Sequence, residues 1–295
     1  MKNKFGFLAL TLALVVVLLP FSALAKEGDV LVTLGEDLTP QEKEAILKDL
    51  DAPEDAEYVY VSNKEEYDYL GDVLPAKNIG SKAISSAIVH YTEEGSGIHV
   101  TLSPVVKVIK EDAYRNALIT AGIKDADIYV TAPGNVSGSA ALTGLLKTYE
   151  KKTGQKLPEE VKKVANKEMV VTSELTEEVG EDKANDFMNS VKVQMAEKMP
   201  KNEEEVRGII QNIENQYNIN LSEGQKTQVV NLFNDMKNTN IDWDNVKEQA
   251  GKYSQKAKDY INSEEGQKNL KKAKSLIQRF IDWVFSLFEK SGQEG

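Results

Sequence analysis

The chain has 295 residues, a formal net charge of −11 at pH 7 and no cysteine. An acidic surface repels phosphate backbones, so the composition argues against nucleic acid as a partner. The lack of cysteine excludes disulfides, thiol nucleophiles, iron–sulfur clusters and thiolate zinc sites. Stability must then come from burial, and the length suffices for one large domain or two ordinary ones.

The first residues have the order of an export signal. Lys2 and Lys4 precede an apolar, uncharged run over 5–19, and Ala23-Leu24-Ala25 has the small residues of a cleavage site. The apolar run is shorter than the roughly 20 residues of a transmembrane helix. We therefore predict a signal peptide over 1–25 and a secreted, extracellular protein that begins at Lys26, retained at the cell envelope or released. A cysteine-free exported chain is typical of a Gram-positive surface.

Strand and helix patterns alternate through the first half. Thr39 and Glu42 form a capping box with Pro40 at the first helical position. Asn63 is expected to cap a short helix that ends near Leu70. The expected strands cover 30–34, 58–61, 82–92, 98–108 and 127–131, and the expected helices cover 40–50, 63–70, 111–121 and 137–152. This order predicts an α/β domain with a mixed sheet over 26–153.

The two β-rich runs flank a glycine-containing turn, Glu94-Gly95-Ser96-Gly97, and the pattern predicts a hairpin. The two histidines of the chain, His90 and His99, would lie on its opposite arms. They face each other if Glu94-Gly95 is the turn and are offset if Gly95-Ser96 is. Facing histidines could hold a metal ion, but they lack a third ligand, so ordinary half-exposed strand residues are the default interpretation.

From about residue 158 the patterns are helical. Apolar stripes recur at helical spacing, and Ser222 and Gln225 form a second capping box. The polar, lysine-rich segment 151–156 resembles a domain boundary that is open to trypsin. The predicted fold class is therefore α+β: a mixed α/β N-terminal domain followed by an all-α helical module over 154–295.

No enzyme motif is present. The sequence lacks a His-Glu-x-x-His zinc motif, a Gly-x-Ser-x-Gly elbow and a Ser-x-x-Lys dyad. Asn238, Asn240, Asp242 and Asp244 imitate the first ligands of a calcium loop, but Trp243 replaces the glycine of its sharp turn. Gln249 also stands where the bidentate Glu belongs. Helix capping by Asp242 or Asp244 is the simpler interpretation. We assign no catalytic, metal-binding or cofactor-binding residue.

A Gly- and Ser-rich segment, 133–139, joins a predicted strand to a predicted helix, where α/β proteins often bind anions. It lacks the Lys and the spacing of a phosphate loop, so a helix cap with small residues close to the sheet is the first interpretation. The alternative is a ligand cleft. Its candidate residues are Ser81, Lys82, Asn135, Ser137 and Ser139.

The last predicted helix, within 263–290, is strongly amphipathic and locally basic. Its apolar face must be covered, and the occupant is one of three: the helices of the same chain, an anionic membrane surface or a partner protein. The arc is too short to span a bilayer. The candidate contact residues are Ile277, Arg279, Phe280, Trp283, Val284, Leu287 and Phe288.

Several linear segments resemble the YpuA-like proteins, which are secreted proteins of bacilli and related bacteria. The resemblance rests on segments 30–38, 63–67, 79–86 and 136–144, and on Asp242-Trp243. It covers almost the whole mature chain. It implies export and the two-part layout, and it implies no chemistry.

The sequence as a whole favours an exported, non-enzymatic protein of the cell envelope or the medium that acts by binding. The partner would be an envelope polymer, a membrane surface reached through the C-terminal helix, or another protein. The alternative is an extracytoplasmic hydrolase of unrecognised type that acts at the cell wall through the segments around Ser81 and Ser137.

Overall fold

The computed structural model describes residues 27–253, apart from the side chain of Lys77. The predicted signal peptide and the predicted C-terminal helix lie outside these residues. No helix within 27–253 is long and apolar enough to cross a membrane. The strands are β1 (Val30–Gly35), β2 (Glu57–Val61), β3 (Ser86–Tyr91), β4 (Ile98–Leu102) and β5 (Ala126–Thr131). The helices are α1 (Pro40–Asp49), α2 (Asn63–Leu70), α3 (Ala76–Ile79), α4 (Glu111–Thr120), α5 (Ser139–Thr153), α6 (Glu159–Val179), α7 (Glu181–Lys198), α8 (Glu203–Tyr217), α9 (Glu223–Asn238) and α10 (Trp243–Tyr253).

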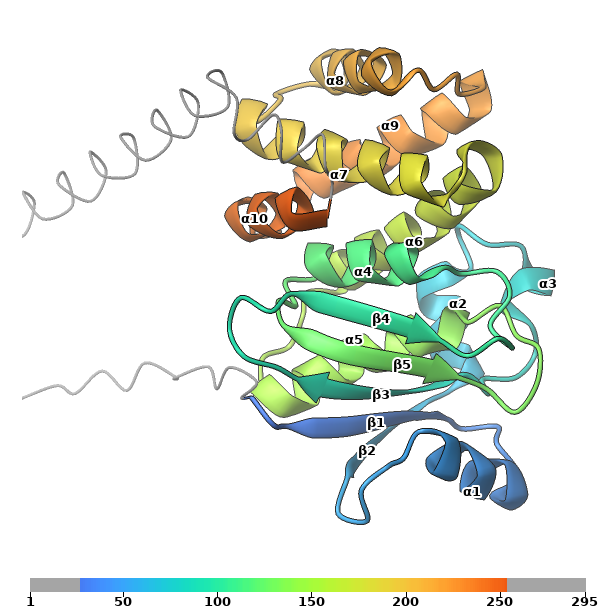
Figure 1. The fold of residues 1–295 in the computed structure, drawn as a ribbon. Helices are drawn as coiled ribbons and strands as arrows, with labels where there is room; N and C mark the ends of the chain where they lie inside the picture. The colour runs from blue at the N-terminus through green and yellow to red at the C-terminus, as the bar shows by residue number, and fades with distance from the viewer. Residues whose placement is uncertain (1–26, 254–295) are drawn as a thin grey trace, which may run out of the picture.

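The strands form one mixed sheet in the order β2-β1-β3-β5-β4 (Figure 1). β1 pairs with β2 and β4 pairs with β5 in parallel, whereas the central β3 runs antiparallel to both of its neighbours. Four strands therefore point the same way, and their carboxyl ends meet at one edge of the sheet. A run of helices follows the sheet, which confirms the predicted fold class.

The predicted hairpin is wrong. β3 and β4 do not pair, because β5 lies between them and bonds to both. The chain leaves β4, forms α4 and returns as β5, which is a parallel crossover unit. The glycine-rich loop passes over the start of β5 instead, where the Asp125 carboxylate accepts the N–H groups of Gly95 at 3.0 Å and Gly97 at 2.8 Å. The sequence has a local turn pattern, but β5, which is more distant in the sequence, pairs with both β3 and β4.

Helices cover the two faces of the sheet unequally. α5 contacts β1, β2 and β3, and α4 contacts β4 on the same face. α5 can approach closely because Gly144 has no side chain, and a Cβ there would lie 1.9 Å from Thr33 Oγ1. On the opposite face, α1 packs over β1 and β3 through a small cluster that includes Ile46 and Ile88. That face is covered only in part (Figure 1).

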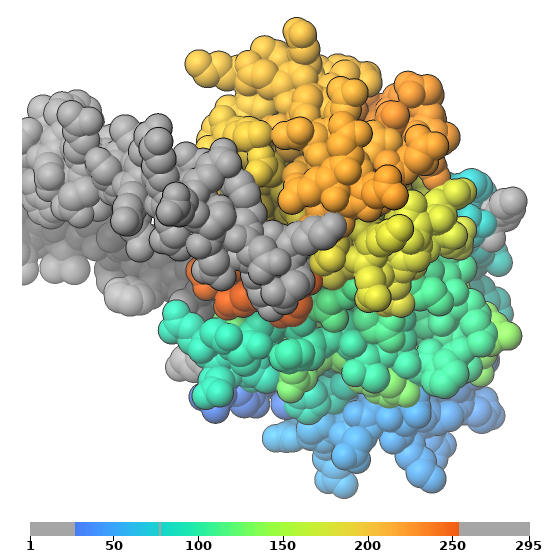
Figure 2. Space-filling model, turned by 45° about the horizontal axis from the view of Figure 1, so that its top comes forward, coloured from blue at the N-terminus to red at the C-terminus, as the bar shows by residue number. Residues whose placement is uncertain are grey.

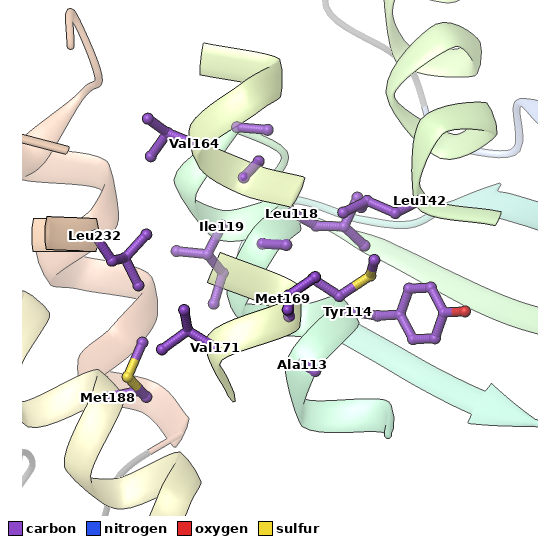
Figure 3. Close-up of a cluster of buried hydrophobic side chains, with 14 of the residues drawn as sticks. Ala113, Tyr114, Leu118, Ile119, Leu142, Val164, Met169, Val171, Met188 and Leu232 are labelled. Atoms are coloured by element: carbon purple, nitrogen blue, oxygen red, sulfur yellow. The ribbon is translucent and has the colours of Figure 1, made fainter. Parts of the chain in front are cut away.

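The helical module is continuous with the core of the sheet. α4 contacts α6 and α7, and α8 and α9 pack on the outer side of these helices. Figure 3 shows this junction, where Leu118 and Ile119 of α4 meet Met169 of α6, with Met188 and Leu232 beyond them. One apolar cluster extends from β1 to α10. In the space-filling view the chain is layered from α1 and the first strands at the bottom to α8 and α9 at the top (Figure 2).

Helix starts follow the sequence closely. Capping boxes at Thr39 and Ser222 begin α1 and α9, as the patterns predict. The cap of α2 differs by one residue: Ser62 is the N-cap, and it forms a capping box with Glu65. Because Ser62 is the cap, the Asn63 side chain does not cap the helix. Its amide donates to the Glu66 carboxylate at 3.3 Å instead.

A fully buried ion pair joins α6 to α7, and its hydrogen bonds connect both helices to α4. Lys192 Nζ lies 2.5 Å from Glu168 Oε1, and both side chains have no exposed surface. The ammonium also donates to the carbonyl of Asn116 at 2.8 Å, and Thr120 donates to the other carboxylate oxygen at 2.5 Å. Burial raises the pKa of Glu168 and lowers the pKa of Lys192, although their mutual attraction opposes both shifts.

The predicted boundary near residue 153 falls in the turn between α5 and α6. Leu157 and Val161, just beyond this turn, belong to the same apolar cluster as the strands. We therefore expect limited trypsin digestion to cut within 151–156 but to leave two fragments that remain associated. Size-exclusion chromatography of the digest under native conditions should give one peak with both fragments. Separate peaks would mean that the two parts hold together only through the peptide chain.

Candidate functional site

The edge where the parallel strands end gathers polar side chains. Asp37 follows β1, α2 follows β2, and the segment before α5 follows β5. In open α/β sheets, ligands commonly bind outside the carboxyl ends of the strands. We call this region the carboxyl edge.

A buried carboxyl group, Glu66, lies at the centre of the carboxyl edge. It is 1% exposed, accepts a hydrogen bond from Ser139 Oγ at 2.9 Å and accepts another from Asn63 Nδ2 at 3.3 Å. Burial raises the pKa of Glu66 to about 7, the hydrogen bonds from Ser139 and Asn63 oppose the rise, and the charge of Asp37 adds to it. A carboxyl group of this kind can change charge near neutral pH.

The start of α5 is shaped to receive this carboxyl. Ser137 Oγ lies 3.1 Å from Ser139 Oγ, and the Tyr114 hydroxyl donates to the carbonyl of Gly138 at 2.5 Å. Gly138 has φ +98°, and a Cβ there would collide with the same Tyr114 hydroxyl. The glycine is therefore required by both its backbone conformation and its close contact.

The predicted cleft residues divide into two groups. Ser139 bonds to Glu66 and Ser137 bonds to Ser139, and we call this set of bonded side chains, together with Asn63, the Glu66 network. Ser139 is buried. Ser81, Lys82 and Asn135 are exposed, and no hydrogen bond among the described residues joins them to the network. Sequence reasoning missed Glu66. The available signal was its position four residues before the buried Leu70, on the same face of α2.

A cleft of about 400 Å³ opens elsewhere, between α2, α6 and α9. This volume lies within the usual range of small-molecule pockets. Its walls come from both parts of the fold, so it is formed only when they pack together. The lining residues are Tyr69, Asp72, Val73, Glu160, Lys163, Val164, Lys167, Asp235, Asn238 and Thr239.

The cleft combines an aromatic wall with charges of both signs. Lys167 pairs with Asp235 across it at 2.5 Å, whereas Lys163, one turn earlier on α6, is exposed and has no salt bridge within 27–253. The Tyr69 hydroxyl donates to Glu159 Oε2 at 3.0 Å, and Lys162 Nζ lies 5.5 Å from the centre of the Tyr69 ring. These contacts fix the ring in the wall of the cleft.

Comparison of the sequence with known proteins places the chain in a family. The family model "Protein of unknown function (DUF1002)" matches residues 34–253. The chain belongs to this family. It is also 40% identical over 288 residues to the uncharacterized protein YpuA of Bacillus subtilis strain 168, with 97% of each chain covered. No solved structure matches.

The DUF1002 match runs from β1 to the end of α10, so the Glu66 network and the α2–α6–α9 cleft both lie inside the part shared with the family. The likeness to YpuA confirms the resemblance that the linear segments indicated. It names no activity, and the chemistry of the site rests on the side chains themselves.

The structure places the histidines on the sheet and the calcium-like run from the end of α9 to the start of α10. His90 and His99 each lie beside Asp127, on either side of it in one row across β3, β5 and β4. No group of three or more His, Asp or Glu residues within 27–253 could hold a metal ion. Asp242 caps α10 by accepting the N–H of Asn245 at 3.0 Å, as the simpler interpretation predicts. The candidate membrane-contact residues, 277–288, lie outside the described residues.

Proposed function

We propose that the protein is exported and acts outside the cytoplasm by binding a polymer of the cell envelope. The observation that carries this proposal is the cleft between α2, α6 and α9. Sugar rings pack against aromatic side chains such as Tyr69, and amide, hydroxyl and carboxylate groups bond to their hydroxyls. Lys163 and Lys167 suit the carboxylate or phosphate groups that such polymers carry.

A hydrolase is the weaker proposal, because the buried carboxyl and its hydroxyl partner are not accessible. Glu66 and Ser139 are each 1% exposed, so neither the carboxyl nor the hydroxyl can reach a substrate without a rearrangement of α2 or α5. A general acid must lie within hydrogen-bond reach of the group that it protonates. Glu66 is better explained as the carboxyl that holds α2 against the start of α5.

Co-sedimentation of the purified mature protein with insoluble cell-wall sacculi, with and without their anionic polymers, tests the binding proposal. We expect Lys163→Ala/Asn238→Ala to weaken binding roughly tenfold or more, because two polar contacts of the cleft are lost. Lys48→Ala/Asn212→Ala makes the same chemical change at exposed positions on α1 and α8 and should bind like the wild type. Equal binding by all three forms would contradict the cleft, and binding to anionic vesicles alone would move the function to a membrane surface.

Export has its own test. The protein recovered from the culture medium of bacteria that express the full chain should begin at Lys26, because Ala23 and Ala25 are the small residues before the cut. N-terminal sequencing gives the answer directly. A first residue more than a few positions away, or retention of the full chain in the cell, would contradict this prediction.

A further inference from the structure

The two outer strands of the sheet, β2 and β4, each have one side without a neighbouring strand. Such edges expose unpaired backbone N–H and C=O groups, which another chain can extend into a larger sheet. In this protein, side chains from the helices occupy backbone carbonyls at both edges.

On β2 the outward carbonyls are those of Tyr58 and Tyr60. Val61 directs its carbonyl toward β1, where it accepts the N–H of Glu36 at 2.8 Å. Because backbone groups alternate in direction along a strand, Tyr58 and Tyr60 direct theirs away from β1. Lys151 Nζ donates to the carbonyl of Tyr58 at 3.0 Å, and Lys147 Nζ donates to that of Tyr60 at 2.5 Å.

The spacing of the two lysines matches the spacing of the two carbonyls. Lys147 and Lys151 are one turn apart on α5, a rise of about 6 Å, and alternate residues of a strand are about 6.6 Å apart. Salt bridges hold both ammonium groups at the edge, because Lys147 lies 2.6 Å from Glu65 and Lys151 lies 3.4 Å from Glu57.

The β4 edge is occupied at its first residue. The hydroxyl of Tyr253, at the end of α10, donates to the carbonyl of Ile98 at 3.0 Å, and Arg115 Nε donates to the same oxygen at 3.2 Å. The Arg115 guanidinium also lies 4.8 Å from the centre of the Tyr253 ring. Within residues 27–253, the side chains that donate to the outward carbonyls of β2 are two lysines, whereas at β4 an uncharged tyrosine hydroxyl shares the carbonyl with Arg115. The β2 edge is therefore the one that a change of charge affects more.

We propose that Lys147 and Lys151 keep the β2 edge closed to a second copy of this chain. Two copies related by a twofold axis would pair their β2 strands antiparallel, and each would offer the other the same free groups. With the lysines in place, such pairing must displace two ammonium groups from the carbonyls of each copy and disturb their salt bridges to Glu65 and Glu57. Removal of these charges leaves the carbonyls of Tyr58 and Tyr60 open to the N–H groups of the partner strand.

The test is the oligomeric state of Lys147→Met/Lys151→Met, measured by sedimentation velocity over a range of concentrations. Met keeps the aliphatic stem on α5 and removes the ammonium group. We expect this variant to self-associate at least about tenfold more tightly than the wild type. Lys48→Met/Lys124→Met removes the same charge from exposed positions elsewhere and should sediment like the wild type, as should Lys147→Arg/Lys151→Arg.

A third substitution distinguishes edge pairing from unspecific aggregation. Tyr60→Pro removes an outward N–H and leaves the bonds to β1 intact, so its addition should return Lys147→Met/Lys151→Met to the wild-type size. Persistent association in the triple variant would overturn the proposal, as would a folded double variant that sediments like the wild type. If the double variant does not fold, Lys151→Met alone keeps the Lys147–Glu65 salt bridge and should shift in the same direction by a smaller factor. No shift in that single variant would equally overturn the proposal.

Discussion

Replacement of Lys192 by Met is expected to lower the free energy of unfolding by about 3–5 kcal/mol. The substitution preserves most of the side-chain volume but leaves the Glu168 carboxylate buried without its counter-charge. The carboxyl must then take up a proton or remain unpaired, and both cost free energy. Removal of the Lys192 charge raises the pKa of Glu168 further, so the carboxyl takes up a proton more readily at low pH. The loss of unfolding free energy should therefore be smaller at pH 5 than at pH 8. Urea unfolding at the two pH values measures both effects.

The matched controls separate charge from packing. Lys183→Met removes a charge from an exposed position of the same helix and should change stability by less than about 0.5 kcal/mol. Lys192→Met/Glu168→Leu removes both buried charges and should recover most of the loss, since apolar replacement of a buried ion pair is often neutral. A double variant as unstable as Lys192→Met would show that the loss comes from packing and not from the unpaired carboxylate.

Glu66→Gln is expected to stabilise the protein at alkaline pH and to change little at acid pH. Burial raises the pKa of Glu66 to about 7, above its ordinary value of 4.5, so the folded state binds this proton more tightly than the unfolded state. The part of the wild-type unfolding free energy that depends on protonated Glu66 is fully present below pH 4.5. It is lost as the pH rises through about 7. A shift of this size corresponds to about 3 kcal/mol.

The measurement is the difference in unfolding free energy between wild type and Glu66→Gln from pH 4.5 to pH 8.5. The stability of Glu66→Gln relative to the wild type should increase as the pH rises across this range. Glu65→Gln, at the neighbouring residue, should show little change over the same range. Burial raises the pKa of Glu65, but its bonds to Lys147 and to the N–H of Ser62 outweigh this and lower it, so the stability that Glu65 contributes is lost only as the pH falls below 4.5. A pH-independent difference for Glu66→Gln would mean that its carboxyl titrates normally.

The parts of the fold that depend on neighbouring residues could be predicted from the sequence. Thr39 and Ser222 begin helices because each caps a helix whose third residue caps it in return. The hairpin prediction failed because pairing in a sheet also depends on distant strands. β5 competes for both β3 and β4, and nothing in the turn around Gly95 records that competition.

The buried charges could not be predicted in the same way. Lys192 lies within an apolar stripe of α7, one turn after Met188, but its partner Glu168 is on another helix. Glu66 follows Glu65 at the start of a polar helix and looks like a solvated residue until α5 packs against it. The α2–α6–α9 cleft has the same origin, because its walls come from segments more than 150 residues apart.

Amide hydrogen exchange of the mature protein, with and without soluble fragments of the cell wall, tests binding at the cleft most directly. Bound ligand should slow exchange at the end of α2, along the α6 turn that contains Lys163 and Lys167, and at the end of α9 near Asn238. Exchange in α1 and α8 should not change. Protection confined to other elements, or no protection at fragment concentrations that fully displace the protein from sacculi, would contradict the proposed function.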